Sequence, residues 1–319
     1  MSRKPVLPSP ADGDETREGL VVRSVGASIR VRAADGSACA CIVRGRLRMQ
    51  DIQTTNPVAV GDRVLFRPPA DDDTGVILDV LPRKNYILRK AIAQAHKVHM
   101  LAANVDQALL VFTIDHPPTS MGFADRFLVV NEAYRIPVRI VINKIDLLTT
   151  PEQLERLALV RDTYTRIGYE VHALSATDPA YRPQVGALLH DKVSFIGGHS
   201  GTGKSALVNL IDPALDLRTG DISAYSGKGK HTTTYAEMHT LAGGGFLIDS
   251  PGIKELGIAG FGAAELSHYF PEMLARLPDC RFNDCTHRNE PGCVVRAALD
   301  AGEIAPSRYK SYLSMLAEV

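Results

Sequence analysis

The chain lacks a long hydrophobic run, a net charge and an abundance of cysteine. No stretch reaches the ~18 consecutive apolar residues of a membrane-spanning helix, which excludes that class of protein. Basic and acidic residues balance at 36 each, so any binding of nucleic acid has to come from local patches. Five cysteines in 319 residues argue against a disulfide framework.

The length of the chain suggests two or three domains. Residues 1–18 are polar, rich in proline, aspartate and glutamate, and without the apolar core of a signal peptide. We therefore expect a disordered tail on a cytoplasmic protein. No feature of the sequence suggests more than a monomer.

Residues 19–82 break into five short strand-like runs between glycine, aspartate and proline turns. The runs read LVVRSV, ASIRVRA, CACIVRGRLR, DRVLFR and GVILDV. This spacing predicts a small closed or nearly closed β-barrel, for which the OB-fold is the commonest option. Cys39 and Cys41 alternate along the third run and are expected to be buried small hydrophobes rather than metal ligands.

Arginines are frequent at the outward positions of this barrel: Arg23, Arg30, Arg32, Arg44, Arg46, Arg48, Arg63 and Arg67. Such a surface suits contacts with an RNA backbone, although acidic neighbours leave a merely solvated basic face as an alternative. Residues 83–97 form a basic linker, which either extends an RNA-facing stripe or keeps a connector soluble.

Residues 98–258 change to an α/β pattern. Apolar strand-like runs centred on 108–112 and 137–142 alternate with helical spacing at 122–135 and 151–168. This alternation predicts a doubly wound sheet with functional loops at the carboxyl ends of its strands.

Residues 198–205 read GHSGTGKS and fit G-x-x-x-x-G-K-[ST], between an apolar run at 193–196 and an apolar helix. Glycines let such a loop wrap its N–H groups around a phosphate. Lys204 would reach the β- and γ-phosphates and Ser205 would bind Mg²⁺. The expected nucleotide contacts are Gly198, His199, Ser200, Gly201, Thr202, Gly203, Lys204, Ser205 and Ala206.

Asn143-Lys144-Ile145-Asp146 is N-K-x-D at the end of a predicted strand. The Asp146 carboxylate can accept two hydrogen bonds from guanine, which adenine cannot supply. Lys144 can lie over the base, and Asn143 can tie this loop to the phosphate loop. Ser175 and Ala176, one strand and helix later, would offer a backbone N–H to guanine O6.

Two further loops complete a GTP site. The polar segment 221–241 contains His231 and a threonine run, of which Thr233 is our choice as Mg²⁺ ligand, although a flexible surface loop is the alternative. Asp249 to Gly252 is D-x-x-G after an apolar strand, which places a carboxylate near Mg²⁺ and a glycine N–H near the γ-phosphate. Ile253 follows where Ras-type GTPases have a water-orienting Gln, so another group has to position the water, and His231 is the candidate.

Three thiols and one imidazole lie within fourteen residues near the C-terminus: Cys280, Cys285, His287 and Cys293. This set suits a closed tetrahedral Zn²⁺ site, which would be structural because no position stays open for chemistry. Residues 259–319 are therefore predicted to be a zinc-binding domain, ending in an amphipathic helix over 309–316.

The guanine-reading pair precedes the phosphate loop in the chain, so the G domain is circularly permuted. Barrel, permuted G domain and Cys₃His module together resemble the ribosome small-subunit-dependent GTPase family (RsgA or YjeQ type). The resemblance spans about residues 21–319 and includes AANVDQALLV, GDRV, GKGKHTTT, IDSPGIKELG, HYFPEM and CRFNDCTHRNEPGC. Thr202 and Ala206 depart from the residues usual in the family, at positions that do not touch phosphate through their side chains.

This resemblance implies GTP hydrolysis in late maturation of the small ribosomal subunit, stimulated by that subunit, together with contacts to ribosomal RNA. It also implies a catalytic histidine in the threonine loop, which corresponds to His231. Two other functions stay open. One is a GTP-binding RNA assembly scaffold in which hydrolysis is incidental, and the other is a P-loop kinase or ATPase with an accidental N-K-x-D.

Overall fold

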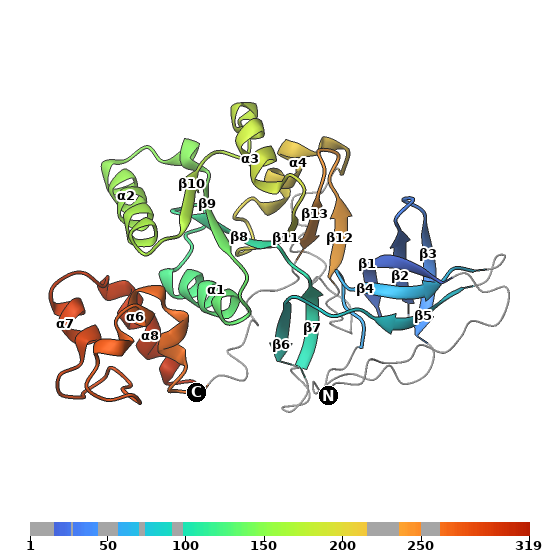
Figure 1. The fold of residues 1–319 in the computed structure, drawn as a ribbon. Helices are drawn as coiled ribbons and strands as arrows, with labels where there is room; N and C mark the ends of the chain where they lie inside the picture. The colour runs from blue at the N-terminus through green and yellow to red at the C-terminus, as the bar shows by residue number, and fades with distance from the viewer. Residues whose placement is uncertain are drawn as a thin grey trace, which may run out of the picture.

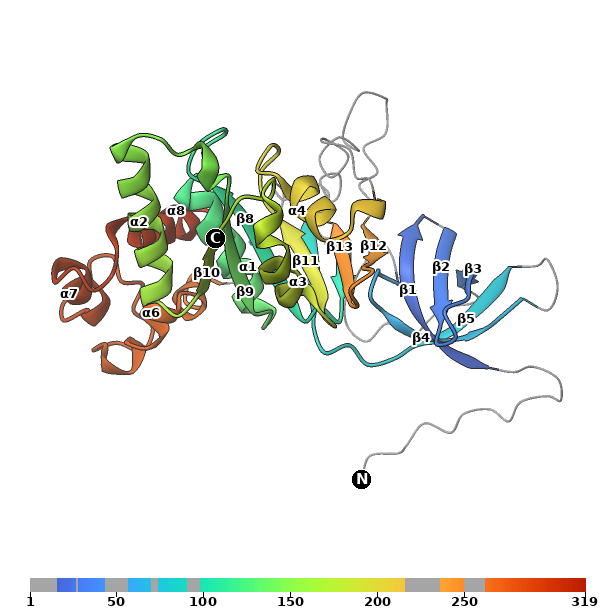
Figure 2. The same cartoon turned by 90° about the horizontal axis from the view of Figure 1, so that it is seen from above.

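The computed structural model describes residues 16–26, 28–43, 57–69, 74–90, 98–215, 236–249 and 262–319. Three parts follow one another along the molecule: a β-rich part, a central sheet with helices around it, and a C-terminal helical part (Figure 1). Seen from above, these parts lie in a row with the central sheet in the middle (Figure 2). Within the described ranges, no helix is long and apolar enough to cross a membrane.

The predicted five-stranded barrel is confirmed. Its strands are β1 (Arg17–Val25), β2 (Ser28–Ala33), β3 (Ala38–Val43), β4 (Arg63–Arg67) and β5 (Gly75–Val80). β1 pairs with both β2 and β4, and β5 pairs with both β3 and β4, so the hydrogen-bonded ladder closes on itself. The interior is filled by Val21, Ile29, Val31, Cys41, Val58, Val64, Phe66 and Ile77.

Both cysteines of β3 line this core, as expected. Cys41 is buried and Cys39 is half-buried, and their sulfurs lie 3.7 Å apart. Burial, together with the neighbouring thiol, raises the pKa of Cys41 to about 12. At neutral pH the Cys41 thiol is therefore a neutral, apolar group in the barrel core.

The predicted outward arginines divide into two groups. Arg23, Arg30 and Arg63 are exposed. Arg32 and Arg67 are half-buried. Arg44, Arg46 and Arg48 lie outside the described residues. All five of the described arginines are thus at least partly exposed.

The barrel continues directly into the central sheet. β1 pairs with β12 (Glu237–Thr240), where Arg23 lies opposite Glu237. The strands form one sheet in the order β10-β9-β8-β11-β13-β12-β1-β2-β3-β5-β4.

The segment expected to be a basic linker carries a strand. β6 (Tyr86–Lys90) pairs with β7 (Val98–Ala103) as an antiparallel two-stranded sheet. Before β6, Arg83 donates to both oxygens of the fully buried Asp62 carboxylate, at 2.6 and 2.7 Å. Lys84 forms an ion pair with Asp106. These two cations fasten the segment to its neighbours, which neither of the two sequence interpretations anticipated.

The central part is the predicted doubly wound α/β fold. Five parallel strands are β8 (Gln107–Thr113), β9 (Val138–Asn143), β10 (Glu170–Ala173), β11 (Val193–Gly197) and β13 (Phe246–Asp249). One face packs against α1 (Met121–Ala133) and α2 (Pro151–Arg166), the other against α3 (Arg182–Leu189) and α4 (Lys204–Ile211). Short 3₁₀ turns are η1 (Ile145–Leu147), η2 (Pro179–Tyr181) and η3 (Pro213–Leu215). Every residue of β8 is buried, as a strand covered on both faces requires.

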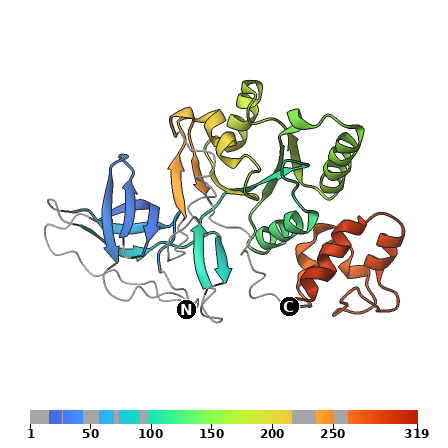
Figure 3. The ribbon, with the colours of Figure 1, turned by 180° about the vertical axis from the view of Figure 1, so that it is seen from behind.

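The C-terminal helical part lies against α1 (Figure 3). Its elements are η5 (Leu266–Tyr269), α6 (Pro271–Leu274), η6 (Leu277–Asp279), α7 (Val294–Asp300) and α8 (Pro306–Leu316). The predicted terminal helix is confirmed and begins at Pro306. Arg308 of α8 is fully buried and donates to Asp125 of α1 at 2.7 Å and to Glu272 of α6 at 2.7 and 3.2 Å. The partner of the terminal helix is therefore α1.

Candidate functional site

The phosphate loop joins β11 to α4, as the sequence predicts. Two of its glycines stand where a side chain would collide with neighbouring atoms. A Cβ at Gly198 would lie 2.5 Å from the carbonyl oxygen of Val111, and one at Gly203 would lie 2.2 Å from Asn143 Nδ2. Gly203 also has φ +92°, which glycine adopts without strain. The close packing of this loop on β8 and β9 thus depends on glycine.

Lys204 is held inside the loop that it follows. The side chain is buried, and Nζ donates to the carbonyl oxygens of Gly198 at 2.9 Å and His199 at 2.8 Å. Burial lowers the pKa of Lys204, and the carboxylate of Asp249 at the end of β13 opposes that shift. The two strands that carry the phosphate loop and Asp249 are neighbours in the sheet, so both charges belong to one site.

Asn143 connects the guanine-reading loop with the phosphate loop. Its buried carboxamide donates from Nδ2 to the carbonyl oxygen of Thr202 at 2.8 Å. Its Oδ1 accepts from the N–H of Ala176, also at 2.8 Å. One side chain therefore holds together three loops whose residues lie 33 and 59 positions from Asn143 in the chain.

The other residues predicted to read guanine lie around this carboxamide. Lys144 has φ +64° and donates from Nζ to the carbonyl oxygen of His116. Asp146 is exposed, whereas Ser175 is buried and its hydroxyl lies 2.9 Å from Thr177 Oγ1. The backbone N–H of Ala176 already donates to Asn143 Oδ1. A guanine O6 that accepts from the same N–H would therefore share this donor with Asn143.

Several predicted site residues are not part of the described structure. His231 and Thr233 fall in 216–235, and Gly252 falls in 250–261, both outside the described residues. Ser205, the other predicted Mg²⁺ ligand, is buried at the start of α4. Of the residues predicted to lie at the Mg²⁺ site, the structure thus describes Ser205 and Asp249.

Sequence reasoning missed an aromatic contact on the phosphate loop. The ring of Phe123, in the first turn of α1, stacks on the imidazole of His199 with centroids 3.8 Å apart and planes 29° apart. Ser120 caps this helix by accepting from the N–H of Phe123 at 3.2 Å. Because the two rings are far apart in the chain, no local pattern could have signalled the contact.

The four predicted zinc ligands converge. The ligand atoms of Cys280, Cys285, His287 and Cys293 all lie within 4.8 Å of one another. His287 turns Nδ1 toward the sulfurs, 3.8 Å from Cys280 Sγ and 3.4 Å from Cys293 Sγ. Burial lowers the pKa of His287, which favours the neutral imidazole that a metal binds. Donor types and geometry therefore fit one tetrahedral zinc ion.

Helix α8 supports the loop that carries these ligands. The hydroxyl of Tyr309 donates to the carbonyl oxygen of His287 at 2.6 Å, and that of Tyr312 to the carbonyl oxygen of Thr286 at 2.8 Å. Burial raises the pKa of the Glu290 carboxyl, but hydrogen bonds from the N–H and hydroxyl of Thr286 and from neighbouring backbone N–H groups outweigh it and lower the pKa to about 2. The hydrogen bonds from the two tyrosines hold the ligand loop against α8.

Comparisons with known proteins agree with this geometry. A sequence profile of the family described as RsgA GTPase matches residues 80–259. The small ribosomal subunit biogenesis GTPase RsgA of Porphyromonas gingivalis is 47% identical over 305 residues, covering 94% of this chain and 96% of that protein. RsgA 2 of Bacteroides thetaiotaomicron, which has the same description, is 44% identical over 299 residues, with 94% and 96% covered.

Two solved structures share the fold over nearly their whole length. YjeQ from Thermotoga maritima is 34% identical with a TM-score of 0.76, covering 95% of this chain and 98% of that one. YloQ, described as a circularly permuted GTPase, is 28% identical with a TM-score of 0.72, covering 97% of each chain. The circular permutation predicted from the order of the motifs is thereby confirmed.

Proposed function

Because the chain belongs to the RsgA family of GTPases, we propose that it acts in late maturation of the small ribosomal subunit, in the cytoplasm and as a monomer. In this proposal it binds the subunit and its RNA, and the bound subunit accelerates hydrolysis of GTP. The observation that carries the proposal is the Asn143 carboxamide, which joins the guanine-reading loops to the phosphate loop. A permuted chain thereby still forms one guanine-nucleotide site.

The nucleotide site has a role for each predicted residue. Asp146 and the loop at Ser175 and Ala176 read guanine, the loop 198–206 holds the phosphates, and Ser205 binds Mg²⁺. Lys204 stabilises charge on the γ-phosphate in the transition state, since an ammonium held in a buried loop acts in a low dielectric. The predicted roles of His231, Thr233 and Gly252 remain part of the proposal: water positioning, Mg²⁺ binding and a γ-phosphate contact.

Zinc has a structural role in this proposal. A Cys₃His set leaves no open coordination position, so the ion would order the ligand loop and supply no chemistry to GTP hydrolysis. The exposed arginines of the barrel and the zinc module would then meet the RNA of the subunit.

The decisive experiment measures GTP turnover by the purified protein alone, with isolated small subunits and with isolated large subunits, and uses ATP as the control nucleotide. We expect strong stimulation by small subunits only and no comparable turnover of ATP. Slow turnover that neither subunit changes would contradict the proposed role. Equal turnover of ATP would contradict the guanine-reading assignment.

The scaffold alternative is tested separately with Lys204→Ala. If hydrolysis drives the maturation cycle, this variant binds small subunits but does not support their maturation. Normal maturation in the absence of turnover would favour the scaffold.

A further inference from the structure

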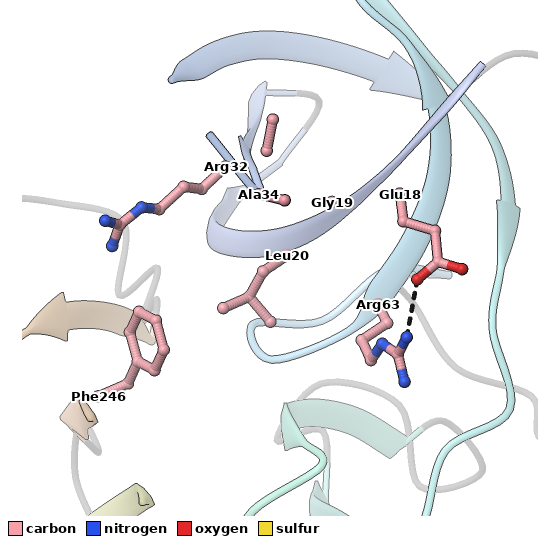
Figure 4. A pocket seen from close by; sticks show the side chains of 8 residues that line it. Glu18, Gly19, Leu20, Arg32, Ala34, Arg63 and Phe246 are labelled. Carbon is pink, nitrogen blue, oxygen red and sulfur yellow. Dashed lines mark hydrogen bonds and ion pairs between the residues drawn. The ribbon is translucent and has the colours of Figure 1, made fainter. Parts of the chain in front are cut away.

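A cavity of about 430 Å³ lies between the barrel and the central sheet. It is lined by Glu18, Gly19, Leu20, Arg32, Ala33, Ala34, Arg63 and Phe246. Figure 4 shows Arg32 and Phe246 on one side, Leu20 between, and the ion pair of Glu18 with Arg63 on the other side. The cavity is outside the GTP site, and its walls come from both domains.

One wall presents an aromatic face with a cation beside it. The guanidinium carbon of Arg32 lies 5.8 Å from the centroid of the half-buried Phe246 ring. Arg32 Nη1 donates to Thr240 Oγ1 at 2.7 Å, which holds the guanidinium in place across the junction between β2 and β12. An unstacked RNA base binds to flat partners of this type, an aromatic ring or an arginine plane.

The opposite wall is polar and the floor is apolar. Arg63 Nη2 donates to Glu18 Oε2 at 2.7 Å, and the two side chains are 63% and 58% exposed. This pair leaves further N–H donors and carboxylate lone pairs for the edge of a base, while Leu20 and Ala33 form an apolar floor. An apolar cavity with a few polar groups at its edge is the usual form of a small-ligand site.

The surface beside the cavity suits a phosphate backbone. Arg23 of β1 and Arg30 of β2 are exposed and lie opposite each other in register. Arg30 is two residues from Arg32 along β2, so both side chains point to the same face of the strand. Where a strand of RNA crosses these arginines, their positive charges would neutralise its phosphates. The base next to those phosphates could then enter the cavity.

We propose that this cavity binds one unstacked base of a single-stranded RNA segment, against the ring of Phe246 and beside Arg32. The inference rests on the proposed binding of ribosomal RNA and adds a base-specific contact to it. Because Phe246 belongs to β13 and Arg32 to the barrel, the bound base touches both domains at once. It therefore holds the barrel against the strand that leads to Asp249 in the GTP site.

The test uses the full-length protein and short single-stranded oligoribonucleotides that contain 2-aminopurine, whose fluorescence falls when the base stacks. We expect quenching on binding. Phe246→Leu and Arg32→Gln should each weaken binding by about tenfold, since stacking of one base contributes about 1–3 kcal/mol. Phe246→Tyr keeps a ring and should bind as the wild type does. Arg30→Gln is the comparison variant, because it removes one expected phosphate contact from the same strand without changing the lining of the cavity, and it should weaken binding less than Arg32→Gln.

Three results would overturn the proposal. The first is a wild-type protein that leaves 2-aminopurine unquenched in every sequence tried. The second is a loss of binding for Phe246→Leu and Arg32→Gln no larger than that for Arg30→Gln. The third is a duplex that binds as tightly as the single strand and depends equally on Phe246, which would indicate recognition of shape.

The proposed function is measured separately, by GTP turnover with and without small subunits. Absent stimulation in the wild type would sink the proposed function, while oligonucleotide binding would still decide the occupant of the cavity. If Phe246→Leu reduced stimulation by the subunit but bound oligonucleotides normally, the cavity would have a protein partner, and the RNA proposal would be wrong.

Discussion

The GTP site and the Cys₃His site are assembled in opposite ways. The GTP site collects loops that lie far apart in the chain, and the Asn143 carboxamide joins them through two hydrogen bonds between neutral groups. The Cys₃His site takes all its ligands from Cys280 to Cys293, a single loop that α8 supports. Geometry at the first site depends on the sheet, whereas geometry at the second depends on local chain and metal. The two sites should therefore respond differently to substitution.

The largest effect is expected from loss of zinc. Cys285→Ser should remove the ion and destabilise the C-terminal part by on the order of 5 kcal/mol, because metal binding and folding are coupled. Zinc content per chain and thermal unfolding measure both effects. GTP affinity should stay close to that of the wild type, and a collapse of GTP affinity would show that the two sites are not independent.

The second largest effect is expected at the buried ion pairs of Arg308, one of which joins α8 of the C-terminal part to α1 of the central part. Arg308→Met leaves the Asp125 and Glu272 carboxylates buried without their cation, and should lower the free energy of unfolding by about 3–5 kcal/mol. Denaturant unfolding measures this loss.

The matched control for Arg308→Met adds Asp125→Asn and Glu272→Gln. No charge then remains buried, so the triple variant should be clearly more stable than the single one. Equal stability of the two variants would mean that burial of charge is not the cause.

A smaller effect is expected at Asn143, whose carboxamide connects the loops of the GTP site. Asn143→Ala leaves the Thr202 carbonyl and the Ala176 N–H without this partner, and should weaken GTP binding by about 10- to 100-fold, or about 1.4–2.8 kcal/mol. Titration with a fluorescent GTP analogue measures it. Zinc content should not change.

Asp146→Asn is the comparison for that variant. It keeps the joint between the loops but replaces the acceptor for guanine by an amide, so GTP should bind more weakly while xanthosine triphosphate gains affinity. Unchanged preference for GTP would show that Asp146 does not read the base.

The smallest effect concerns the aromatic support of the phosphate loop. Phe123→Leu removes the ring that stacks on His199 and should weaken GTP binding by about two- to tenfold, since such pairs contribute about 0.5–1.5 kcal/mol. Phe123→Tyr keeps the stack and should behave as the wild type. An unchanged affinity of Phe123→Leu would mean that the loop keeps its shape without the ring.

Much of the fold follows from local patterns. Each of the five short runs overlaps a barrel strand, and the apolar runs at 108–112 and 137–142 overlap β8 and β9. The barrel runs show the alternation of a strand with one buried face, and the runs in β8 and β9 show the near-continuous apolar stretch of a strand buried on both faces. Neighbouring residues determine both patterns.

The sequence did not reveal the partners of its charged side chains. Arg83 and Lys84 begin the segment expected to extend an RNA-facing stripe or to keep a connector soluble, and they pair with acidic residues 21 and 22 positions away in the chain. The hairpin of β6 and β7 was also missed, because a short strand in a basic segment has little apolar periodicity. A partner distant in sequence leaves no local pattern.

By itself the sequence determined the motifs, the order in which they occur and the Cys₃His set that fits zinc, because each depends on residue types at short spacing. Only the tertiary structure decided which loops Asn143 joins, which helix receives α8, and where Phe246 meets Arg32. The buried ion pair between Asp125 and Arg308 spans 183 positions of the chain. Contacts of that kind form because the sheet and its helices bring distant segments together, and folding of the whole chain is what places them.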